Sequence, residues 1–194
     1  MQVSISLIIR IREKKVDDIK RIKRELVAKG HILDYYHDTV QISNGNVVVW
    51  DFIGHKGAAA VVPVLEDGRI LMVKQYRNAL DRYTIEIPAG GVDSIDEPHY
   101  DAAMRELKEE TGYTTDKLEF LIAVNTTVAF CNEKISIYVA HISGNGGAQE
   151  LDEDEFINVI PYEVCELERL IYAGEITDSK TVAAIMAYKN KYVK

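Results

Sequence analysis

The feature that most constrains this chain is a set of seven residues at fixed spacing. They are Gly91, Glu97, Arg105, Glu106, Glu109, Glu110 and Gly112. The stretch from Ala102 to Glu110 is rich in strong helix formers. Pro98 is typical of a first helical turn, and Gly112 is typical of the position just past a helix end. The pattern therefore predicts a helix preceded by a glycine-containing loop.

Three glutamates of this pattern fall on one face of the predicted helix. Glu106, Glu109 and Glu110 are separated by three and four residues, so their like charges repel one another. A divalent cation would remove that cost, and carboxylates are the ligands that Mg²⁺ prefers, with Mn²⁺ as an alternative. Arg105 can pair with Glu109. The other interpretation is an ordinary solvated acidic face, which the additional residues at set distances make the weaker one.

Composition limits the class of protein and its partners. The chain has 194 residues, of which 47% are hydrophobic and 28% charged, with a net charge of −8. This balance is typical of a globular domain, and it argues against nucleic acid or an anionic membrane surface as a partner. The two cysteines form neither a disulfide framework nor a zinc motif. Without a signal-like start or an 18-residue apolar run, we expect a cytoplasmic protein.

Hydrophobic periodicity predicts an α+β fold in which strands and helices do not alternate regularly. We expect a helix over residues 14–28, then a hairpin of strands 31–42 and 46–53 joined at Asn44-Gly45. The later strands are predicted at 57–65, 69–76, 84–87, 117–127, 133–141 and 155–160. Two C-terminal helices are predicted at about 161–173 and 178–191, the second capped by Thr177 or Asp178. We divide the chain into an N-terminal extension, 1–56, and a main domain, 57–194.

Further short motifs accompany the seven-residue pattern. They are Gln75-Tyr76-Arg77, Glu86-Ile87-Pro88-Ala89-Gly90, Asn132-Glu133-Lys134, the acidic run 152–155, and Gly174-Glu175-Ile176 with Asp178 and Thr181. With them, the chain from about residue 29 onward resembles the ADP-ribose pyrophosphatase branch of the Nudix hydrolases. The resemblance implies an α/β/α sandwich around a mixed sheet. It also implies a homodimer in which N-terminal strands reach across to the partner subunit.

The resemblance assigns metal-binding and catalytic roles residue by residue. Glu106 and Glu110 are implied as central metal ligands, Glu109 as a further ligand or catalytic helper, and Glu155 as another metal contact. The backbone carbonyl of Ala89 would complete one ion's shell. Two further residues are implied to serve catalysis, Arg105 by holding Glu109 in place and Glu153 as the general base. For the acidic run itself, a solvated turn is the alternative interpretation.

Four residues are implied to bind substrate. Arg77 would contact the diphosphate or ribose, Trp50 would stack on adenine, and Glu86 and Phe130 would line the same site. Trp50 could instead be a core or dimer-interface residue, because tryptophan is largely buried on average. For Arg77, a surface charge is the weaker alternative interpretation.

Two departures from the family pattern bear on substrate and geometry. An extra glycine stands between Pro88-Ala89-Gly90 and the five-residue gap, so Gly90 and Gly91 both fit the first position. The proline expected some 16 residues after the pattern is absent from residues 127–131. The expected reaction is Mg²⁺-dependent hydrolysis of ADP-ribose to AMP and ribose 5-phosphate. The alternatives are hydrolysis of a dinucleotide or damaged nucleotide, or a ligand-sensing module without hydrolytic activity.

Overall fold

The computed structural model describes residues 18–151 and 156–193. The chain separates into two compact units at the boundary between Ile53 and Gly54. Within the described ranges, no helix combines the length and the apolar character that a membrane span requires.

The N-terminal unit is a three-stranded sheet with the order β1-β2-β3. Its strands are β1 (Lys20–Lys29), β2 (Asp34–Gln41) and β3 (Val47–Gly54). The predicted hairpin is confirmed, with Gly45 at φ 86° in the turn between β2 and β3. The carboxylate of Asp38 accepts bonds from Nε and Nη2 of Arg24, both 2.6 Å long, and so joins β2 to β1.

The predicted helix over residues 14–28 is wrong where the structure describes it, because β1 occupies residues 20–29. Residues 14–17 lie outside the described residues. The strand pairs antiparallel with β2, and its register shifts between Arg21 and Lys23 and again between Leu26 and Ala28. Each shift adds a residue and changes the phase of side-chain alternation. The apolar residues Ile22 and Leu26 therefore stand at helix-like spacing within a strand.

The second unit is built on a mixed sheet with the order β10-β5-β4-β9-β8, in which β6 also pairs with β5 and β7 with β4. Strands β4 and β9 pair in parallel. The pairs β10–β5, β4–β5, β4–β7, β5–β6 and β8–β9 are antiparallel. The strands are β4 (Ala58–Val64), β5 (Ile70–Arg77), β6 (Arg82–Glu86), β7 (Ala89–Gly91), β8 (Leu118–Asn125), β9 (Lys134–His141) and β10 (Ile157–Tyr162). A 3₁₀ turn, Asn78–Leu80, separates β5 from β6.

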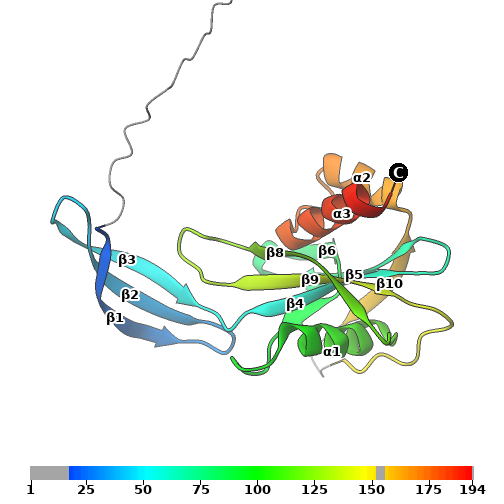
Figure 1. The fold of residues 1–194 in the computed structure, drawn as a ribbon, viewed down its shortest axis with the longest axis horizontal. Coiled ribbons are helices and arrows are strands. Elements are labelled where there is room, and N and C mark those ends of the chain that lie inside the picture. The colour runs from blue at the N-terminus through cyan, green and yellow to red at the C-terminus, as the bar shows by residue number, and fades with distance from the viewer. Residues whose placement is uncertain (1–17, 152–155, 194) are drawn as a thin grey trace, which may run out of the picture. The chain divides into compact units, whose positions relative to one another are not determined.

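Three helices cover the two faces of this sheet, as Figure 1 shows. Helix α1 (His99–Thr111) lies on one face, and α2 (Val164–Tyr172) and α3 (Ser179–Tyr192) lie on the other. The central strand β4 is buried on both sides, with Val61 packed in the α1 layer and Val62 in the opposite layer. The expected α/β/α sandwich around a mixed sheet is confirmed.

The fold fixes the loop that precedes α1. Strand β7 pairs with β4, with Gly91 opposite Ala58 and Ala89 opposite Ala60. Helix α1 packs against the same strand through Ala103 and Leu107. Residues 89–91 and the glutamate-bearing helix are therefore held side by side on one framework strand.

Candidate active site

Helix α1 presents the predicted glutamates with an unusual burial pattern. It ends at Gly112, which has φ 71° and donates its N–H to the carbonyl of Lys108. Glu106 and Glu110 are only 8% and 3% exposed. Buried carboxylates are costly unless they are paired or hydrogen-bonded, so the surroundings of α1 must compensate for them.

Arg105 supplies much of that compensation. Its Nη1 lies 2.6 Å from Oε1 of Glu106 and 2.9 Å from Oε2 of Glu109. Its Nη2 donates to the carbonyl of Gly91 at 2.9 Å, and its Nε lies 3.5 Å from Oε1 of Glu97. Burial alone would lower the pKa of Arg105, but Glu106 and Glu109 raise it far above its usual value. Arg105 therefore stays charged and ties α1 to the preceding loop.

The structure gives Gly90 and Gly91 different tasks. A Cβ atom built on Gly90 would overlap the carboxylate of Glu106, whereas one on Gly91 would find nothing nearer than the carbonyl of Gly57 at 3.9 Å. Next to Gly90, the N–H of Ala89 donates to Oε2 of Glu110 at 2.9 Å. Gly90 is thus the residue whose missing side chain makes room for the carboxylates, and Gly91 acts through its carbonyl.

This donor set fits a hard divalent cation. Carboxylates of α1 and the backbone of residues 89–91 meet in a partly buried place, and oxygen ligands of this kind suit Mg²⁺ or Mn²⁺. Among residues 18–151 and 156–193, no group of three or more His, Cys, Asp or Glu side chains is already arranged around a common metal position. In this structure Arg105 provides the positive charge that the Glu106 and Glu109 carboxylates require.

A second charged cluster surrounds Glu86, which is 2% exposed. Arg77 donates to both of its oxygens, from Nε at 2.8 Å and from Nη2 at 2.7 Å. Lys180 of α3 donates to Oε2 at 2.5 Å, and the hydroxyl of Thr84 donates to Oε1 at 2.6 Å. Burial would raise the pKa of Glu86, but the bonds from Arg77 and the charge of Lys180 outweigh it and lower the pKa to about 2.

The two clusters are electrostatically connected. The hydrogen bonds to Glu86 raise the pKa of Arg77 in spite of burial, and the charges of Glu110 and Asp178 raise it further. Arg77 and Glu86 were both predicted as site residues, and the structure brings them together. Lys180 was not predicted, because it stands 94 positions from Glu86 in the sequence and only the folded structure, which brings the first turn of α3 to the end of β6, reveals the contact.

The lowered pKa of Glu86 predicts a pH dependence of stability. Its folded-state pKa of about 2 lies below the ordinary value of 4.5, so the unfolded chain binds the proton more readily. The stabilisation is complete above pH 4.5 and is lost as the pH falls toward 2. We expect the free energy of unfolding, measured by urea titration at pH 5 and pH 3, to fall more for the wild type than for Glu86→Gln. Equal losses would contradict the ion-pair assignment.

A glycine-rich segment, residues 144–150, lies against the end of α1 and is called the strap below. Three of its hydrogen bonds reach this end of the helix. They run from the N–H of Gly147 to the Gly112 carbonyl (2.7 Å), from the N–H of Glu150 to the Glu109 carbonyl (2.9 Å), and from Nε2 of Gln149 to the Glu110 carbonyl (2.5 Å). Carbonyls in the last turn of a helix lack partners within the helix, and the strap satisfies them. The chain then enters residues 152–155, so the predicted Glu153 and Glu155 lie outside the described residues.

The two predicted aromatic contacts lie in different units. Trp50 is on β3 of the N-terminal unit and is 48% exposed, so it is not a core residue of that unit. Phe130 follows β8 in the second unit, in a turn where its N–H donates to the carbonyl of Thr127, and is 49% exposed.

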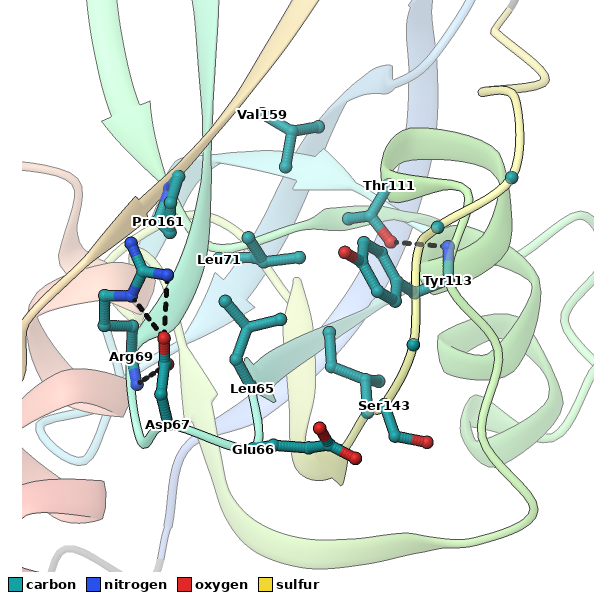
Figure 2. A pocket seen from close by; sticks show the side chains of 14 residues that line it. Leu65, Glu66, Asp67, Arg69, Leu71, Thr111, Tyr113, Ser143, Val159 and Pro161 are labelled. Carbon is teal, nitrogen blue, oxygen red and sulfur yellow. Dashed lines mark hydrogen bonds and ion pairs between the residues drawn. The ribbon is translucent and has the colours of Figure 1, made fainter.

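A cavity of about 570 Å³ lies elsewhere in the second unit. Figure 2 shows Tyr113 and Thr111, just past the glutamates of α1, facing Leu65 and Leu71 across it, with the Asp67–Arg69 pair at one side. None of its lining residues is a predicted site residue. The candidate chemistry is therefore in the carboxylate cluster and not in this cavity.

Comparison with known proteins agrees with this geometry. The NUDIX domain model matches residues 54–185. The ADP-ribose pyrophosphatase of Bacillus subtilis (strain 168) is 39% identical over 167 residues, covering 86% of this chain and 90% of that protein. The methanol dehydrogenase activator of Bacillus methanolicus is 38% identical over 172 residues, covering 88% and 92%. A crystal structure of an ADP compounds hydrolase has a TM-score of 0.79 at 22% identity, covering 91% of this chain and 95% of that chain, and so shares the fold.

The match extends over the whole second unit apart from its last residues, and it includes the seven-residue pattern on α1 and its loop. Members of this family typically use a divalent metal ion. With a carboxylate helix buttressed by Arg105 and a family model that covers most of the chain, this protein belongs to the Nudix hydrolases.

Proposed function

We propose that this protein hydrolyses the diphosphate bond of ADP-ribose or a closely related nucleoside diphosphate sugar, with Mg²⁺ as the metal and Mn²⁺ as a substitute. ADP-ribose would yield AMP and ribose 5-phosphate. The observation that carries the proposal is the buried pair Glu106 and Glu110 on α1. Arg105 joins Glu106 to the carbonyl of Gly91, and the missing side chain of Gly90 leaves room for the Glu106 carboxylate. The relatives named as ADP-ribose pyrophosphatases, at 39% and 32% identity, point to the substrate.

The chain's own residues divide the work. Glu106, Glu109, Glu110 and the carbonyl of Ala89 would hold the metal, which when bound neutralises phosphate charge and acidifies water. Arg77 would bind the diphosphate: Glu86 engages its Nε and Nη2, and 38% of the side chain remains exposed. Water oxygen would bond to one phosphorus as the bridging P–O bond breaks, and the departing phosphate keeps the bridging oxygen.

The proton released by that water requires an acceptor. We propose Glu153 for this task and Glu155 as a further metal contact. The support comes from the strap that directly precedes them in the sequence. Gln149 and Glu150 of the strap donate hydrogen bonds to the carbonyls of Glu110 and Glu109, so the strap lies beside the helix that carries the proposed metal ligands. A carboxylate is a suitable base because the metal-bound water is already acidified.

The N-terminal unit supports a homodimer. Among its described residues, only Val40 and Asp38 are buried, while Ile22, Val49 and Trp50 are about half exposed. A three-stranded sheet with so little core requires a partner surface. We propose that residues 1–56 form a dimerisation extension and bring Trp50 to the adenine. Light scattering should give twice the 21.9 kDa chain mass; a monomer at micromolar concentration would contradict this.

Two free cysteines, Cys131 and Cys165, fit a reducing cytoplasm.

A substrate panel tests the proposed reaction. The purified protein is incubated with Mg²⁺ and with ADP-ribose, other ADP-sugars or dinucleotides, and the release of phosphomonoesters is measured. We expect kcat/KM to be highest for ADP-ribose or an ADP-sugar. Turnover of dinucleotides alone would favour the second candidate, hydrolysis of another nucleoside diphosphate derivative. That candidate is favoured by the missing proline in residues 127–131. Binding of ADP-ribose without hydrolysis of any member would instead indicate a ligand-sensing module.

A further inference from the structure

The carboxylate of Glu86 accepts one bond from α3 in addition to those that the neighbouring strands provide. Arg77 and Thr84, on β5 and β6, account for three of its four bonds, and Lys180 provides the fourth. Four donors match the number of lone pairs that a carboxylate offers. Thr84 fixes one Glu86 oxygen and Lys180 fixes the other. The planar guanidinium of Arg77, which donates to both oxygens, is therefore held in one orientation.

The cluster is balanced in charge. Lys180 also donates to Oδ2 of Asp178 at 2.9 Å, so two cations, Arg77 and Lys180, face two carboxylates, Glu86 and Asp178. The side chains of Lys180 and Glu86 are 9% and 3% exposed, whereas that of Arg77 is 38% exposed. Because Lys180 offsets the buried Glu86, the partly exposed Arg77 side chain keeps a positive field toward solvent, where an anionic ligand would approach.

The start of α3 and the residues just before it are attached to β6 and to the residue that follows β6 by more than this ion pair. The hydroxyl of Thr181 accepts from the N–H of Ile87 at 3.0 Å, and Nη2 of Arg82 donates to the hydroxyl of Thr177 at 2.8 Å. Asp178 caps the helix by accepting from the N–H of Thr181. Of these contacts, the bond between Ile87 and Thr181 joins two uncharged groups, so it provides a means to separate the attachment of α3 from the charge of Lys180.

We propose that Lys180 is a positioning residue for substrate binding: it offsets the charge of Glu86 from the α3 side, so that Arg77 stays oriented and its positive charge remains available to a nucleoside diphosphate. The proposal rests on the proposed function only in requiring that Arg77 contacts the diphosphate. Lys180 itself touches no reacting atom, so its loss should affect binding and leave the chemical step unchanged.

Steady-state kinetics with matched variants tests this role. Lys180→Met changes the charge of the cluster from zero to −1, so we expect KM to rise about ten-fold with kcat nearly unchanged, the size expected for loss of a charged hydrogen-bonding partner. Lys180→Arg should recover much of the affinity. Asp178→Asn keeps a capping side chain and shifts the charge to +1, so KM should fall. Thr181→Val removes the hydroxyl's bonds to Ile87 and Asp178 without altering charge, so the melting temperature should fall while KM changes much less than in Lys180→Met.

A double-mutant cycle determines whether Lys180 acts through Arg77. If it does, Arg77→Met combined with Lys180→Met should bind no worse than Arg77→Met alone, because coupled residues are non-additive. Binding of ADP, measured by calorimetry, follows the same cycle without requiring turnover, so it separates this proposal from the proposed reaction. Additive losses, a KM effect of Thr181→Val equal to that of Lys180→Met, or a Lys180→Met variant that lowers only kcat would overturn it.

Discussion

The Glu110→Gln variant is expected to lose about 100- to 1,000-fold in kcat at saturating Mg²⁺, the range found when one preorganised charge-stabilising group is removed. Glu110 is 3% exposed, and its Oε2 accepts from the N–H of Ala89. Glutamine has nearly the same shape and can accept the same bond, so the change removes charge and leaves packing intact. The loss should therefore appear in the chemical step.

Two measurements distinguish loss of the metal site from a general loss of stability or activity. Mg²⁺ should raise the melting temperature of the wild type, since a ligand that binds the folded state stabilises it, and this increase should vanish in Glu110→Gln. Glu150→Gln is the matched control, because the Glu150 side chain is 58% exposed and pairs only with Lys108 at the surface; its kcat should stay within about two-fold, as weak surface pairs imply. Wild-type turnover by Glu110→Gln would remove Glu110 from the metal site.

Gly90→Ala is expected to lower kcat about 100-fold, a magnitude typical of a small misplacement near the reacting groups. The added methyl would overlap the carboxylate of Glu106, which would have to leave its place beside Arg105. Neither Gly90 nor Gly91 has a positive φ angle, so alanine meets no backbone penalty at either position. The effect is therefore one of space at the carboxylate.

Gly91→Ala is the internal control for this prediction. The neighbouring position offers room for a Cβ, and the carbonyl that accepts from Arg105 is unchanged by the substitution. Its kcat should remain within a factor of about three, as for a substitution outside any of the strongly destabilising classes. Both variants should be folded by circular dichroism. Equal activity of the two variants would show that Glu106 is not confined as the structure indicates.

Local sequence signals predicted the parts of the fold that depend on neighbouring residues. The helix end at Gly112, the turn at Gly45 and the cap at Asp178 are each determined by one residue's chemistry, and the structure confirms all three. Strand β1 was mistaken for a helix because two register shifts imitate helical spacing. Pairing with β2 overrides such local periodicity, and it is a long-range property that a window of residues does not contain.

For the candidate site too, the sequence predicted the contacts within one element and missed the contacts between distant parts of the chain. Glu106, Glu109, Glu110 and Arg105 belong to one helix, so their spacing alone predicted that they meet. The choice between Gly90 and Gly91 required knowing where the Glu106 carboxylate lies. Lys180 and the strap at Gly147 reach the site from distant parts of the chain. No pattern in the sequence relates Lys180 to Glu86, because their contact arises only where the fold brings the first turn of α3 to the end of β6.

Hydrolysis of ADP-ribose in ¹⁸O-labelled water, with products identified by mass spectrometry, tests the central claim most directly. Attack of water on phosphorus predicts AMP and ribose 5-phosphate in equal amounts, with one ¹⁸O atom in only one of the two phosphomonoesters, and formation of product about 100- to 1,000-fold slower with Glu110→Gln at the same enzyme concentration. Recovery of intact ADP-ribose with Mg²⁺ and with Mn²⁺, or release of ADP in place of AMP, would contradict the assignment of a diphosphate hydrolase.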